Sequence, residues 1–123
     1  MPVDLLHTFP LTHEHAVHTL LEAPWTPEEQ NFISERSLCT LMDPIGSRLR
    51  THWYLDEPTG ILPHHYKKRF ALGDGGDMAA LMILNWLAVL HSEKFNLEGY
   101  VQELRNSWIK RGIDPLTLEK RKV

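Results

Sequence analysis

Apolar residues recur at helical spacing through most of this chain. The first such run follows Thr12 and comprises Ala16, Val17, Leu20 and Leu21. A spacing of three or four residues places apolar side chains on one face of an α-helix, and a threonine just ahead of the run can cap it. We therefore predict a short amphipathic helix that ends before Pro24.

A second helix is predicted to begin after Thr26. The sequence Thr26-Pro27-Glu28-Glu29 combines a capping threonine, a proline in the first turn and a glutamate placed to complete a capping box. The apolar pattern continues to Met42. The following Asp43-Pro44 is expected to end this helix, because proline cannot donate a backbone hydrogen bond.

The most apolar helix is predicted over residues 78–95, where apolar side chains occur almost all round. Asp77 is placed to cap it. Asn96 is placed to cap a further amphipathic helix, which Gly112 would end. The fold class expected from these segments is mainly α, with four to six helices around one central apolar helix in a single domain over residues 1–123.

The pattern changes between Arg48 and Leu55, where polar and apolar residues alternate. Alternation with a period of two is typical of a strand with one solvated face. With a turn over residues 56–60, it allows a small β-hairpin over residues 48–62. From Pro63 onward, Tyr66 and Phe70 lie four residues apart and favour a short helix.

Composition places the chain among ordinary globular proteins. It has 123 residues, of which 42% are hydrophobic and 24% are charged. The single cysteine, Cys39, cannot form an internal disulfide, and its apolar neighbours predict a buried thiol. The first residues lack the basic start of a secretory signal, and the longest apolar stretch, residues 78–90, is too short to span a bilayer. We expect a cytoplasmic protein that does not associate with membranes.

Metal binding has weak candidates. Glu14 and His18 share one helical stripe with Glu22, and Asp74 and Asp77 lie in a glycine-rich loop. Zinc usually requires four ligands, or three with water, and neither segment has the regular spacing of a zinc or calcium motif. We interpret the histidine-rich segment as an exposed polar face, and expect no cofactor and no catalytic residue.

A loose family resemblance involves the segments His52-Trp53-Tyr54-x-Asp56, Gly76-Asp77-Met78 and Phe95-Asn96-Leu97-Glu98. Their order resembles that of segments in the ADP-ribosylglycohydrolases. The magnesium motif of that family has adjacent acids followed by threonine, whereas here Gly76 and Met78 flank Asp77. The second acidic motif is missing. The resemblance therefore implies a degenerate, metal-dependent hydrolase-like remnant, which is our third hypothesis.

Basic and aromatic residues give the leading hypothesis. They lie on the segments expected to be exposed: Arg48, Arg50, Trp53, Tyr54, Lys67, Lys68 and Arg69. Aromatic residues and arginines are common anchors of protein interfaces. We expect a small non-catalytic interaction module, of adaptor, chaperone or inhibitor type, with another protein as partner. Nucleic acid is the alternative partner, because basic side chains can bind phosphates while neighbouring aromatic side chains stack on nucleobases. Self-association is compatible with either hypothesis.

Overall fold

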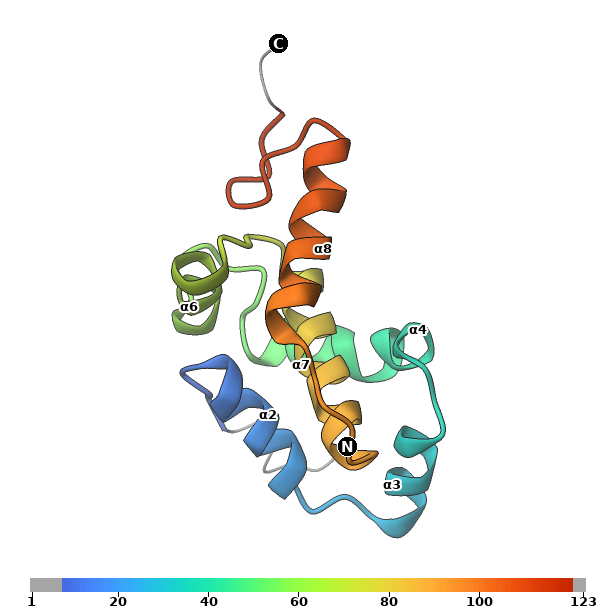
Figure 1. Ribbon diagram of the computed structural model, residues 1–123. Helices are drawn as coiled ribbons and strands as arrows, with labels where there is room; N and C mark the ends of the chain where they lie inside the picture. Colours follow the sequence, from blue (N-terminus) through green and yellow to red (C-terminus); the bar gives the residue numbers. More distant parts are fainter. Residues whose placement is uncertain (1–7, 121–123) are drawn as a thin grey trace.

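The computed structural model describes residues 8–120, and helices dominate that range (Figure 1). In chain order they are α2 (His13–Glu22), α3 (Pro27–Ser34), α4 (Leu38–Leu41), the π-helix η1 (Met42–Gly46), α5 (Ser47–His52), α6 (Ile61–Phe70), α7 (Gly75–Leu90) and α8 (Leu97–Lys110). The described residues contain no β-strand, although Ile113 and Lys120 form an isolated antiparallel bridge. The expected mainly-α fold is confirmed.

Helix α7 lies at the centre of this arrangement, with α2, α6 and α8 beside it (Figure 1). Its side chains are buried on several faces, as its nearly uniform apolar composition predicts. Trp86 of α7 stacks on Trp25, with ring centroids 5.2 Å apart. The indole nitrogen of Trp25 donates to the carbonyl oxygen of Leu20 at 2.8 Å, which leaves its polar atom satisfied inside the core.

Local capping signals account for most helix starts. Thr12 accepts a hydrogen bond from the amide of His15, and Thr26 and Glu29 form the expected capping box. Asn96 caps α8 as predicted. Helix α7 differs, because Asp74 rather than Asp77 is its cap: the carboxylate of Asp74 accepts from the amide of Asp77 at 2.9 Å. The helix therefore begins at Gly75, three residues before the predicted start.

The predicted second helix is divided in the structure. It breaks over residues 35–37, and Pro44 does not end the helical path but lies inside η1. Proline has no N–H to donate, so the regular hydrogen-bond ladder is interrupted, and the wider π-turn accommodates the gap. The chain then continues directly into α5.

The β-hairpin over residues 48–62 does not form. Residues 47–52 are helical, and α6 begins at Ile61. The sequence was ambiguous here, because Leu49 and Trp53 are four residues apart, and this spacing places both on one side of either a strand or a helix. In the structure both side chains are buried against the core.

No helix in the described part of the chain combines the length and the apolar character needed to cross a membrane. Cys39 is exposed, so the expectation of a buried thiol was wrong.

Candidate functional site

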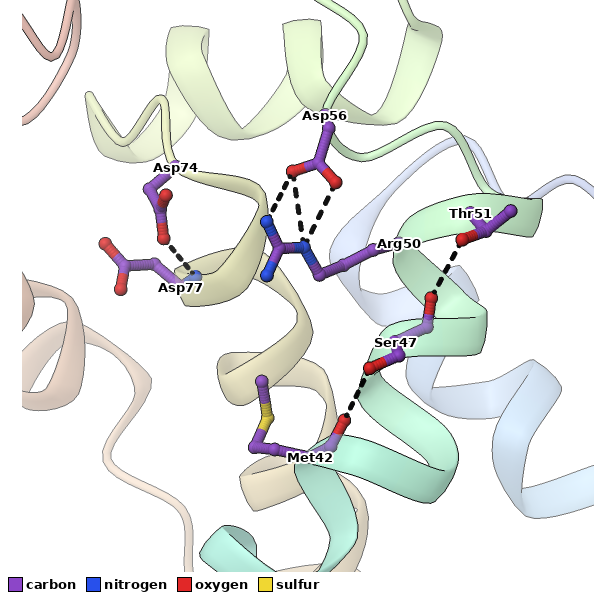
Figure 2. Close-up of polar contacts among 7 residues, drawn as sticks. All are labelled: Met42, Ser47, Arg50, Thr51, Asp56, Asp74 and Asp77. Carbon is purple, nitrogen blue, oxygen red and sulfur yellow. Dashed lines mark hydrogen bonds and ion pairs between the residues drawn. The ribbon is translucent and has the colours of Figure 1, made fainter.

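Arg50 lies on α5 and is held by Asp56, which follows in the next turn (Figure 2). Its Nε lies 3.1 Å from Asp56 Oδ2, and its Nη2 lies 3.0 Å from Oδ1, so the guanidinium engages both carboxylate oxygens. The hydrogen bonds to Asp56 raise the pKa of Arg50, and the charge of Asp74 acts in the same direction. The guanidinium of Arg50 therefore already has an ion-pair partner within the protein, the carboxylate of Asp56.

The three basic residues of α6 do not form one surface. Successive side chains on a helix project about 100° apart. Arg69 forms an ion pair with Glu14 of α2, Lys67 donates to the carbonyl oxygen of Pro58 at 3.4 Å, and Lys68 is exposed. All three lie in the last turn of α6, where basic residues interact favourably with the helix dipole. Their sequence clustering therefore has a structural explanation.

The other predicted contact residues have different surroundings. Trp53 is only 3% exposed, so the expectation that it lies on an exposed face was wrong. Its burial follows from the helical path of α5, which directs it into the core. Arg48 is exposed and lines a hollow of about 360 Å³ together with Glu28 and Glu29, whose charges oppose its own. Tyr54 is 54% exposed.

Asp77, a weak metal candidate, has a protein partner. Its Oδ2 accepts a hydrogen bond from the indole nitrogen of Trp108 on α8 at 2.6 Å. Burial raises the pKa of Asp77, and the hydrogen bond from Trp108 offsets part of that rise. Asp74 points beside it and serves as the cap of α7 (Figure 2). This arrangement joins α8 to the start of α7.

Glu14 and His18, the other metal candidates, also have partners. Glu14 is paired with Arg69, and His18 Nε2 lies 3.0 Å from Glu22 Oε1 on the same exposed face of α2. Across residues 8–120, no three histidine, cysteine, aspartate or glutamate side chains gather in a way that could hold a metal ion.

The most distinctive surface feature is an apolar groove of about 520 Å³. It lies between the segment that precedes α2 and the turn that joins α5 to α6. Its lining consists of Phe9, Pro10, Leu11, Trp53, Tyr54, Glu57, Thr59, Gly60, Ile61 and Leu62. We call this feature the groove.

Large apolar side chains of the groove reach into solvent. Phe9 is 56% exposed, Leu11 and Tyr54 are each 54% exposed, and Ile61 is 66% exposed. The rings of Phe9 and Tyr54 stack almost in parallel, with centroids 6.2 Å apart. Tyr54 has a backbone φ of 55°, in the left-handed region that costs a non-glycine residue about 1–2 kcal/mol. The residue with this left-handed backbone, just after α5, is therefore also one whose aromatic ring is exposed to solvent.

Sequence reasoning found Tyr54 but not Phe9, Leu11 or Ile61. Phe9 and Leu11 flank Pro10, just before the capping residue Thr12. Two large apolar residues outside any predicted helix were the sequence signal that could have indicated an apolar surface here. Ile61 was assigned to a strand that does not form.

Comparison with known proteins gives no match: neither a protein-family model, nor a curated protein, nor a solved structure matches this chain.

Proposed function

We propose that this protein is a small non-catalytic interaction module, of adaptor, chaperone or inhibitor type, that binds apolar side chains of a partner protein in the groove. The supporting observation is the exposure of Phe9, Leu11, Tyr54 and Ile61 around one concave surface. Contiguous exposed apolar surface is unfavourable in water and is typical of sites that a partner covers. We place its action in the cytoplasm, because its single cysteine leaves the fold without a disulfide.

The groove also indicates the chemistry of its partner. Its floor includes the buried side chains of Trp53 and Leu62, and its rim includes the exposed carboxylate of Glu57. An apolar floor selects apolar side chains, and an acidic rim favours a basic residue beside them. We therefore expect a partner segment with one or two large apolar residues next to a lysine or arginine.

Nucleic acid has less support as a partner. Arg50 and Arg69 are each paired with a carboxylate, and Arg48 lines the same hollow as Glu28 and Glu29. Binding that depends on phosphate contacts weakens steeply as salt is added, because counterions are released on binding. A steep loss of affinity with added salt would favour the nucleic-acid alternative, whereas binding by apolar contacts would change little.

Peptide selection provides a direct test. Peptides selected from a random library on the purified protein should carry large apolar residues, and their affinity can be measured by fluorescence anisotropy. Replacement of Ile61 by alanine should raise the Kd about tenfold or more, which corresponds to about 1.4 kcal/mol. Val89→Ala is the matched control, because Val89 is 45% exposed but does not line the groove. Equal loss in both variants would contradict the proposal.

A further inference from the structure

His13, the first residue of α2, is fully buried, contrary to the expectation of an exposed histidine face. It connects three helices. Its Nδ1 lies 2.5 Å from the hydroxyl of Tyr66 on α6, and its Nε2 lies 2.9 Å from Oδ1 of Asn85 on α7. Both ring nitrogens of His13 thus have partners on other helices, and Tyr66 is fully buried as well.

The partners define the protonation state of His13. The amide oxygen of Asn85 can only accept, so Nε2 carries the hydrogen and donates it. Nδ1 then has a lone pair and accepts the hydroxyl hydrogen of Tyr66. The neutral imidazole therefore satisfies both of its own nitrogens and the hydroxyl of Tyr66, which matters because an unsatisfied buried polar group costs about 1–3 kcal/mol.

The network is directly connected to the groove. The wall residues Phe9, Pro10 and Leu11 immediately precede the first turn of α2. The amide of Leu11 donates to His15 Nδ1 at 3.2 Å, which ties the wall to that turn. The position of α2 against α6 and α7 therefore determines where one side of the groove lies.

We infer that His13, Tyr66 and Asn85 are positioning residues of the groove: they fix the first turn of α2 and so set the wall formed by residues 9–11. This inference builds on the proposed function of the groove. Tyr66 and Asn85 do not line the groove, so an effect of these residues on binding acts through the helices that they position: α2, which follows the wall, and α6, whose first two residues line the groove.

Protonation of His13 should disturb this arrangement. Nδ1 would become a donor, and the hydroxyl hydrogen of Tyr66 would lose its acceptor. Charged and titratable groups near the ring come from the adjoining helices: Glu14 from α2, and His65 and Arg69 from α6, while α7 contributes the neutral Asn85. The charge of Glu14 would favour the imidazolium, but this carboxylate is already paired with Arg69.

Burial lowers the pKa of His13, and the charges of Arg69 and His65 also lower it, against the opposing effects of Asn85 and Glu14. At neutral pH the network is therefore intact. Affinity for a groove peptide should fall only when the solution is acidified below the ordinary histidine pKa of 6.5. Burial lowers the pKa of His65 too, so a control variant must show that His65 is not the group whose protonation changes peptide affinity.

The test uses peptide affinity and amide hydrogen exchange together. Tyr66→Phe keeps the buried ring but removes its hydroxyl, and should raise the Kd of a groove peptide about three- to tenfold at neutral pH, the range that one lost buried hydrogen bond supports. It should also accelerate exchange at Leu11 and Ala16, but not along α8. Unchanged affinity and unchanged exchange at these amides would overturn the inference.

A pH profile tests whether His13 is the group whose protonation lowers peptide affinity. His13→Gln retains a side-chain donor but cannot titrate, so the loss of peptide affinity on acidification should be absent in this variant and present in His65→Gln. Acid-sensitive binding that persists in His13→Gln would overturn the inference. If no peptide binds the groove, the proposed function fails, and the exchange measurement with Tyr66→Phe still decides whether the network fixes the wall.

Discussion

Gly75 should not tolerate a side chain, because the first turn of α7 passes very close to Leu55 and Asp56 in the turn that joins α5 to α6. A Cβ at this position would lie 2.2 Å from Oδ1 of Asp56 and 2.9 Å from the carbonyl oxygen of Leu55. The carboxylate of Asp56 is held by Arg50, and the Leu55 oxygen belongs to the backbone, so neither can move freely. Gly75→Ala must therefore displace one of these groups.

The size of the effect follows from two opposing contributions. Overpacking of this kind costs about 1–3 kcal/mol. Alanine is favoured over glycine within a helix by up to about 1 kcal/mol, and less at a helix start. We expect Gly75→Ala to lower the free energy of unfolding by about 1–2 kcal/mol.

The neighbouring Gly76 provides the matched control. A Cβ there would meet only side-chain atoms, 3.0 Å from Oδ2 of Asp74 and 3.5 Å from a guanidinium nitrogen of Arg50. Gly76→Ala should remain within about 1 kcal/mol of the wild type, because the helical preference of alanine offsets a small adjustment. The cost of Gly75→Ala should also decrease in an Asp56→Ala background, where the nearest clashing atom is absent.

Urea unfolding followed by circular dichroism measures the wild type, the three single variants and the Asp56→Ala/Gly75→Ala double variant, and equal m values would show that the unfolded states are comparable. Gly75→Ala with the same stability as Gly76→Ala would refute the reasoning. An unchanged cost in the Asp56→Ala background would show that the carboxylate is not the obstacle.

Two further predictions concern titrating groups. Because the pKa of His13 is lowered in the folded state, the unfolded chain binds more protons below pH 6.5, and the free energy of unfolding should fall there by at most about 1.4 kcal/mol per pH unit, until the folded pKa is reached. Subtracting the profile of His13→Gln isolates this contribution, and identical profiles would contradict it. Trp108→Phe removes the hydrogen bond that lowers the pKa of Asp77, so carbon NMR of that carboxyl should show a higher pKa; a lower value would contradict the assignment.

Local signals made much of the fold predictable. Helix caps depend on residues three positions apart, and this is why Thr12, Thr26 and Asn96 could be assigned from the sequence. The central helix was equally clear, because its apolar composition requires burial on several sides. The spacing of Leu49 and Trp53 satisfied both a strand and a helix, so the sequence could not decide between the two.

Long-range contacts determined the parts that sequence reasoning missed. His13 bonds to Tyr66, 53 residues away, and to Asn85, 72 residues away. Helical spacing places His13 on the same side of α2 as Val17 and Leu20, but no local pattern identifies its two partners. The groove likewise brings together Phe9 and Tyr54, which are separated in sequence by α2, α3, α4, η1 and α5. The predicted basic surface was dispersed for the opposite reason, because residues close in sequence point in different directions around α6.

The most direct test of the proposed function is an NMR titration of the isotopically labelled protein with a selected apolar peptide. Binding in the groove predicts amide shift changes concentrated at residues 9–11 and 53–62, with little change along α8. Changes centred instead on the basic residues Arg48 and Lys68, or spread evenly over the protein, would contradict the assignment of the groove as the binding site.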